Sequence, residues 1–263
     1  MASEDNRPGI RAKPPALGYA IAEPLRAVFE LVCLLPAHLF LKRAPRGDGH
    51  PVITLPGYRS DDTAMLAMRR YLERWGYAPY PWGLGANLGI GYQRIDYETR
   101  MLEKLDKVVE KHGEPATMIG WSQGGVIARE IAKQRPELVR QIIVLGTPLA
   151  DAPEATTVFR IFRRTSSEEI TSELMSFMRE VATPLPDVRC ICIYSNSDGI
   201  VSADIAQDVV SPNVENIRVT SSHLGMVVNP MVLFIIADRL SQPEDDWQPF
   251  NMYALDHLLS WSR

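Results

Sequence analysis

The sequence predicts an α/β protein with a mostly parallel, doubly wound sheet of about six strands. Short apolar runs alternate with longer amphipathic runs from residue 51 onward, which is the rhythm of β-α-β units. Glycine or proline stands at several of the junctions between these runs. The chain of 263 residues, 46% of them hydrophobic and 23% charged, is long enough to bury a sizeable core.

The expected elements follow from the apolar patterns in order. The strands are short apolar runs at 52–55, 77–80, 117–121, 139–145, 188–194 and 216–219. The helices are amphipathic runs at 62–75, 94–112, 123–135 and 227–240. A helix is also expected just after the strand at 188–194, where Asp204 and Asp208 would be solvated.

The chain divides into four parts. Residues 1–15 carry charges and three prolines, and we expect a flexible arm. Residues 16–45 form an N-terminal helical segment. Residues 149–185 are too long for a simple crossover, so we expect a helical cap inserted over the sheet. Residues 46–148 and 186–263 make up the α/β core.

The N-terminal segment is long and apolar, yet four residues interrupt it: Arg26, Glu30, Pro36 and His38. A basic cluster follows, formed by Lys42, Arg43 and Arg46. One interpretation is a helix packed on the body of the domain. A second is an in-plane membrane or partner-binding helix, with the basic cluster facing anionic headgroups. A spanning helix is least favoured, because a span needs roughly 20 apolar residues with few charges.

Composition argues against several classes of partner. The net charge is −4, and no basic stripe is interleaved with aromatic residues, so we expect no nucleic-acid partner. Cys33, Cys190 and Cys192 have no metal-ligand spacing and are expected to be buried thiols. The acidic start of the chain is unlike a signal peptide, so we expect a cytoplasmic protein. Under the second interpretation of the N-terminal segment, residues 17–46 would also contact the inner membrane peripherally.

The motif Gly120-Trp121-Ser122-Gln123-Gly124 lies between a predicted strand and a predicted helix. This is the setting of a nucleophile elbow, in which a sharp, strained turn lifts a serine hydroxyl above the sheet. The glycines keep side chains away from the point where strand and helix crowd together. We therefore predict Ser122 as a catalytic nucleophile.

A serine hydroxyl needs a base to activate it. Where this motif opens a helix, an acid and then a histidine follow the serine along the chain. Only His223 and His257 come after Ser122. His223 follows a predicted strand, at the end of the sheet where open α/β sheets bind ligands. His257 lies among apolar residues of the tail, so we predict His223 as the base.

The base in turn needs a carboxylate to orient it. Asp198 follows the strand at 188–194, in a turn with Gly199. Asp187 precedes that strand and so lies at its wrong end. We therefore predict Asp198 as the acid of the triad.

The developing oxyanion needs backbone N–H donors, which we assign to Gln123, directly after the nucleophile, and to Tyr58, after the first strand. The apolar cap suggests an apolar acyl group. We expect four side chains to contact the substrate, namely Trp121, Phe159, Phe162 and Leu224. No metal and no cofactor is expected.

Five segments resemble the α/β-hydrolase superfamily, and within it bacterial lipases and esterases with a small cap. They are 55–58, 120–125, 144–148, 197–201 and 222–225, with the sequences LPGY, GWSQGG, VLGTP, SDGIV and SHLG. Two features depart from the family pattern. Pro56-Gly57 stands where many relatives have His-Gly, which alters the pocket and leaves the backbone donors in place. A helical segment replaces two antiparallel strands, which predicts a shortened sheet.

The resemblance and the predicted triad together imply a serine hydrolase that cleaves carboxylic esters through an acyl-enzyme, an esterase or lipase. A thioesterase or acyltransferase would use the same triad, and the sequence does not separate these activities. A catalytically silent fold that binds lipid or a partner is a third hypothesis, because a fold alone does not prove activity. The three predicted catalytic residues argue against it.

Overall fold

A computed structural model describes residues 12–159, 179, 181–183, 185, 188–209, 211–244 and 246–251. Most of the expected arm and cap, and all of the tail from residue 252, lie outside these residues. The described part of the cap includes a short 3₁₀ turn, Pro153–Ala155. An isolated bridge from Thr156 to Val201 ties it to the core.

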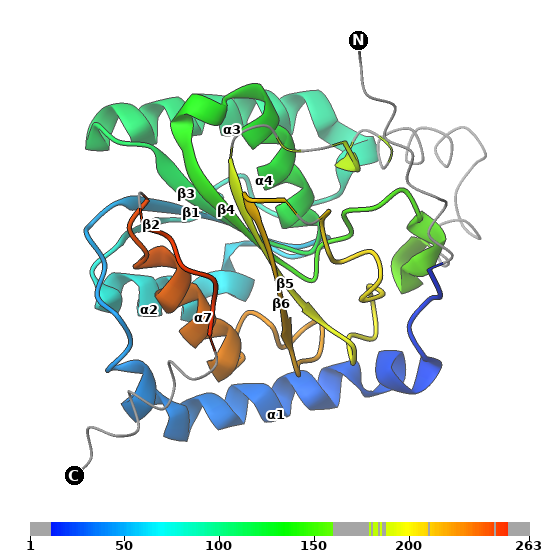
Figure 1. Cartoon of the computed structure of the whole chain (residues 1–263). Coiled ribbons are helices and arrows are strands. Elements are labelled where there is room, and N and C mark those ends of the chain that lie inside the picture. The colour runs from blue at the N-terminus through cyan, green and yellow to red at the C-terminus, as the bar shows by residue number, and fades with distance from the viewer. Residues whose placement is uncertain are drawn as a thin grey trace.

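A sheet of six strands forms the centre of the molecule (Figure 1), in the order β2-β1-β3-β4-β5-β6. Its strands are β1 Pro51–Leu55, β2 Ala78–Tyr80, β3 Ala116–Trp121, β4 Val139–Leu145, β5 Arg189–Ser195 and β6 Val214–Val219. All five neighbouring pairs are parallel. The predicted α/β fold class with six strands is therefore confirmed, within one or two residues at most strand ends.

Helices cover both faces of the sheet (Figure 1). They are α1 Leu17–Leu41, α2 Leu66–Trp75, α3 Ile90–His112, α4 Gln123–Gln134 and α7 Pro230–Leu240. One buried apolar cluster joins the sheet to α2 and α7, and a second joins it to α3 and α4. The expected helix at 62–75 begins with a 3₁₀ turn, Asp62–Met65, and that at 227–240 begins at Pro230.

Helix α1 crosses the carboxyl ends of β5 and β6 and continues alongside α7 (Figure 1). The Phe40 and Phe234 rings pack with centroids 5.3 Å apart, and the Trp75 indole N–H donates to the Leu41 carbonyl at 2.9 Å. Helix α1 has 25 residues and, by length and composition alone, is apolar enough to cross a membrane. Of its apolar stretch, 17% is buried against the rest of the described chain. It is packed on the domain, as the first interpretation of this segment predicts.

The expected helix containing Asp204 and Asp208 is not formed, since residues 201–209 make a bridge and turns. The physical reason lies in Asn216 of β6, which accepts from the Asp208 N–H at 3.0 Å and donates to its carbonyl at 3.0 Å. Asp204 is exposed, as expected. Asp208 is instead buried and pairs with the buried Arg129 of α4.

Replacing Asp208 with asparagine is expected to lower the free energy of unfolding by about 3–5 kcal/mol, since it leaves the Arg129 charge buried without a counter-charge. The acceptors around Arg129 would then all be neutral, among them the carbonyls of Val181 and Thr183 and the Cys190 sulfur. Urea unfolding measures the loss. The exposed Asp204→Asn is the matched control and should stay within about 0.5 kcal/mol of wild type. Equal losses in the two variants would contradict the prediction.

Candidate active site

Ser122 occupies a strained turn between β3 and α4. Its φ of 54° and ψ of −122° lie outside the regions that residues with a side chain prefer. The turn is held from both sides: the Ser122 N–H donates to the Leu145 carbonyl at 2.8 Å, and the Ser122 carbonyl accepts from the Thr147 hydroxyl at 2.9 Å. A backbone held in this way fixes the position of the Ser122 Cβ, from which the hydroxyl extends.

The glycines around Ser122 are required by close packing. A Cβ on Gly120 would lie 2.3 Å from the Gly125 Cα, and one on Gly124 would lie 2.2 Å from the Leu55 carbonyl oxygen. A Cβ on Gly125 would lie 2.1 Å from a side-chain oxygen of Thr147. Strand β3, helix α4 and the loop after β1 therefore meet at distances that only glycine permits. Sequence reasoning anticipated the first two glycines but did not single out Gly125.

Asp198 and His223 form a buried hydrogen-bonded pair. The His223 Nδ1 lies 2.7 Å from Asp198 Oδ2, and the two residues are 3% and 4% exposed. Asp198 Oδ1 accepts the N–H groups of Ile200 and Val201 at 2.7 and 2.8 Å. Since both carboxylate oxygens are engaged, the carboxylate is fixed in orientation toward the imidazole.

Two opposing effects act on the imidazole of His223. Burial disfavours its charged form, whereas the charge and hydrogen bond of Asp198 and the charge of Glu23 favour it. The favourable effects win, and the pKa of His223 is raised above its ordinary value. An imidazole with a raised pKa accepts a proton more readily, as a general base must.

The elbow and the buried pair meet at the carboxyl ends of β3, β4, β5 and β6. The Trp121 indole N–H, next to the elbow, donates to the His223 carbonyl at 3.0 Å. Gly146, directly after β4, lies under the pair, and a Cβ there would be 3.0 Å from both Asp198 Oδ2 and His223 Nδ1. The structure thus brings Ser122, Asp198 and His223 to one edge of the sheet.

The loop after β1 lies against the elbow. A Cβ on Gly57 would be 3.3 Å from the Ser122 Cβ. Among the described residues, neither the Tyr58 N–H nor the Gln123 N–H donates a backbone hydrogen bond. Asn87 braces this loop, since its amide donates to the Pro56 carbonyl at 3.0 Å. The sequence contained no motif signal for Asn87.

The other predicted residues differ in their exposure to solvent, and some of them lie outside the described residues. Trp121 is 7% exposed and Phe159 6%, so both are largely covered, whereas Leu224 is 39% exposed beside His223. Phe162, His257 and Asp187 lie outside the described residues. In the described ranges, no group of three or more His, Cys, Asp or Glu side chains could hold a metal ion.

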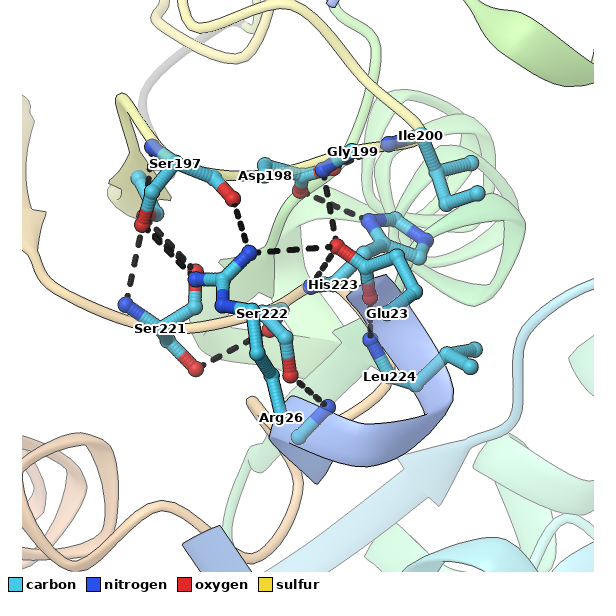
Figure 2. Close-up of polar contacts among 12 residues, drawn as sticks. Glu23, Arg26, Ser197, Asp198, Gly199, Ile200, Ser221, Ser222, His223 and Leu224 are labelled. Carbon is cyan, nitrogen blue, oxygen red and sulfur yellow. Dashed lines mark hydrogen bonds and ion pairs between the residues drawn. The ribbon is translucent and has the colours of Figure 1, made fainter. Parts of the chain in front are cut away.

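Two buried glutamates of α1 also reach the site, and sequence analysis missed their role. Glu23 accepts the His223 N–H at 3.0 Å, and Glu30 accepts the Ser222 N–H at 2.7 Å. Figure 2 shows the Glu23 carboxylate between the loop of Asp198 and Gly199 and the loop of His223 and Leu224. The signal for these contacts was a pair of carboxylates seven residues apart on a mostly apolar helix.

Comparisons with known proteins agree on the fold. A family model described as alpha/beta hydrolase fold matches residues 55–173. Alpha/beta hydrolase domain-containing protein 10 from mouse is 21% identical, with 75% of this chain and 92% of that chain covered and a TM-score of 0.52.

Two lipases have similar structures. For the lipase BlEst2 of Bacillus licheniformis the identity is 14%, the coverage 76% of this chain and 94% of that chain, and the TM-score 0.53. A monoacylglycerol lipase of Paleococcus ferrophilus is 11% identical, with 74% of this chain and 96% of that chain covered and a TM-score of 0.52. No curated protein matches the sequence. At these identities the likenesses establish a shared fold.

Proposed function

We propose that this chain, whose residues 55–173 match a family model described as alpha/beta hydrolase fold, is a serine hydrolase that cleaves carboxylic esters with an apolar acyl group. The observation that carries the proposal is the buried hydrogen bond of 2.7 Å between His223 and Asp198, at the sheet edge where the strained Ser122 lies. A buried, oriented imidazole at the same sheet edge as a half-buried serine in a strained turn is the arrangement that nucleophilic catalysis needs.

In the proposed reaction, His223 Nε2 takes the proton of the Ser122 hydroxyl as its oxygen attacks the ester carbonyl. Asp198 holds the proton on His223 Nδ1 and stabilises the imidazolium. The N–H groups of Tyr58 and Gln123 bind the oxyanion. The imidazolium then protonates the leaving alcohol, and a water molecule, activated by the same histidine, releases the acid from the acyl-enzyme.

An apolar substrate is supported by the side chains on the surrounding loops. Four large apolar residues there are more than a third exposed: Tyr58 37%, Leu88 50%, Val158 38% and Leu224 39%. We propose that Leu224 and the rim around it contact the acyl chain, with Phe159 beneath the rim. Phe162 stays a proposed contact. Trp121 also holds the carbonyl of His223, so its effect on the substrate would be largely indirect.

The test is to treat the full chain with a fluorophosphonate probe, to map the label by peptide mass, and to assay nitrophenyl esters of increasing acyl length. We expect label on Ser122 and faster turnover of longer acyl chains than of acetate. No label together with no turnover would refute the hydrolase proposal. Label on Ser122 with a preference for acyl-thioesters, or transfer to an added alcohol, would identify a thioesterase or an acyltransferase instead.

We also propose that α1 lies on a membrane surface, which would place the protein in the cytoplasm, peripheral to the inner membrane. The large residues on its outward face are apolar and at least 43% exposed: Leu17, Tyr19, Ile21, Leu25, Val28, Phe29, Leu31, Val32, Leu35 and Leu39. Lys42, Arg43 and Arg46 are exposed at the end of the helix. An apolar face with a basic edge suits an anionic lipid surface.

Leu25→Glu is expected to reduce sedimentation with anionic phospholipid vesicles about tenfold or more, because it exchanges about 1.5–3 kcal/mol of apolar burial for a charge. Leu25 is 76% exposed, so the fold should tolerate the change. Leu66→Glu, at a site 40% exposed on α2, is the matched control and should sediment like wild type. Equal sedimentation of both variants and wild type would remove the membrane proposal.

A further inference from the structure

Glu23 of α1 joins the two loops that carry Asp198 and His223. Its Oε1 accepts the N–H of Gly199 at 2.8 Å and the N–H of His223 at 3.0 Å, and its Oε2 accepts the N–H of Leu224 at 3.0 Å. Glu23 is only 1% exposed. One buried carboxylate therefore holds the residue after Asp198, His223 itself and the residue after His223 (Figure 2).

Arg26 holds the other side of the acid loop. Its guanidinium donates to the Ser197 carbonyl at 2.5 Å and to the Ser197 hydroxyl at 2.8 Å. It also lies 3.8 Å from the Glu23 carboxylate. Both chain neighbours of Asp198 are thus bonded to α1, and Asp198 cannot move relative to that helix without breaking charge-assisted hydrogen bonds.

Glu30, two turns along α1, makes a parallel set of bonds to the base loop. It accepts the Ser222 N–H at 2.7 Å, the Ser221 hydroxyl at 2.5 Å and the Asn229 amide at 3.0 Å. It hydrogen-bonds to neither Asp198 nor His223. Glu30 therefore docks the helix on the loop before His223, whereas Glu23 bonds to His223 itself and to Gly199, the residue after Asp198.

The glycines of both loops are required by α1. A Cβ on Gly199 would lie 2.5 Å from the Tyr19 backbone carbon and 2.6 Å from the Ala20 nitrogen. A Cβ on Gly225 would lie 2.4 Å from Glu30 Oε2. Neither glycine has a positive φ, so it is the close approach of α1 that excludes a side chain. The docked position of α1 is therefore built into the sequence of both loops.

We propose that Glu23 is a positioning residue that sets the relative position of the Asp198 and His223 loops from the N-terminal helix. The inference rests on the proposed function for its effect on turnover. A shift of about 1 Å in a catalytic group can cost roughly 10²-fold in rate, so a link across the two loops bears directly on the reaction.

Glu23 also acts on His223 by charge. The groups that face His223 are Asp198 from the β5 loop and, from α1, Glu23 with Arg26 beside it and Glu30 beyond Ser222. Glu23 contributes to the raised pKa of His223, after the larger effect of Asp198. Removing its charge should lower the pKa of His223, and the neutral base would persist to lower pH.

The test compares Glu23→Gln with Glu30→Gln, a matched control on the same helix with the same loss of a buried carboxylate. In Glu23→Gln the new amide group faces the Leu224 N–H, donor against donor. We expect kcat to fall about 10–100-fold with little change in KM, and the acid limb of kcat/KM to move to lower pH. In Glu30→Gln the acid limb should stay where it is in wild type.

A second measurement does not depend on turnover. NMR titration of the His223 imidazole, assigned with His223→Ala, should give a lower pKa in Glu23→Gln than in wild type and no change in Glu30→Gln. That result stands even if wild type hydrolyses no ester, in which case only the proposed function fails. Suppose instead that wild type hydrolyses esters, that Glu23→Gln and Glu30→Gln have the same kcat, and that neither variant changes the pKa of His223. That result would overturn the positioning role.

Glu23→Asp covers the case in which Glu23→Gln does not fold. It keeps the charge and shortens the reach to the three N–H groups, so kcat should fall while the acid limb stays in place. Wild-type kcat in a folded Glu23→Asp would overturn the proposal, because the shorter side chain cannot make the same set of bonds.

Discussion

Replacing Ser122 with alanine is expected to lower kcat for ester hydrolysis about 10⁶-fold. The variant has no hydroxyl to form the acyl-enzyme, and the histidine and backbone donors alone give only a weak residual rate over water. Active-site titration with a fluorophosphonate, followed by ester kinetics at saturating substrate, measures the loss. No label should appear at position 122 in the variant.

The variant separates chemistry from folding because alanine keeps the Cβ of serine. The φ of 54° is as strained for alanine as for serine, so the melting temperature should stay close to that of wild type. Ser202→Ala is the matched control, since Ser202 is a buried serine on the loop after β5 that accepts the Asp204 N–H at 3.4 Å. A Ser122→Ala variant with more than a tenth of wild-type kcat would mean that another residue is the nucleophile.

The sequence predicts the sheet well because parallel strands covered on both faces are continuous apolar runs. All residues of β1 and β3 are buried, and both strands were expected within a residue of their ends. The predicted partners Asp198 and His223 do form a hydrogen bond. They could be found because a parallel sheet brings the carboxyl ends of its strands to one edge, so position after a strand predicts position in space.

The role of α1 could not be found in this way. In a helix with a narrow polar stripe, the polar residues recur at the same spacing along the sequence whether the stripe faces water or protein. Here the polar stripe faces inward, and Glu23 bonds to His223, which is 200 residues away in the chain. The burial of Asp208 was missed for a similar reason, because its partner Arg129 lies 79 residues before it. Contacts of this kind depend on tertiary placement, which local patterns do not specify.

Replacing Asp198 with asparagine is expected to lower kcat about 10⁴-fold, because the change reverses the tautomer of His223. Asparagine Oδ1 can still accept the N–H groups of Ile200 and Val201, as the Asp198 oxygen does. Its amide group then faces His223 Nδ1 and donates to it. The imidazole proton moves to Nε2, where it faces Ser122 and blocks transfer of the serine proton.

The same substitution removes the charge that raises the pKa of His223, so NMR titration should show that pKa lowered. Activity that remains should therefore extend to lower pH than in wild type, because the base stays neutral there. Asp204→Asn, in the same loop but exposed, should leave both the rate and the titration unchanged. A loss of less than tenfold in Asp198→Asn would show that the 2.7 Å bond holds the loop and does not orient a catalytic base.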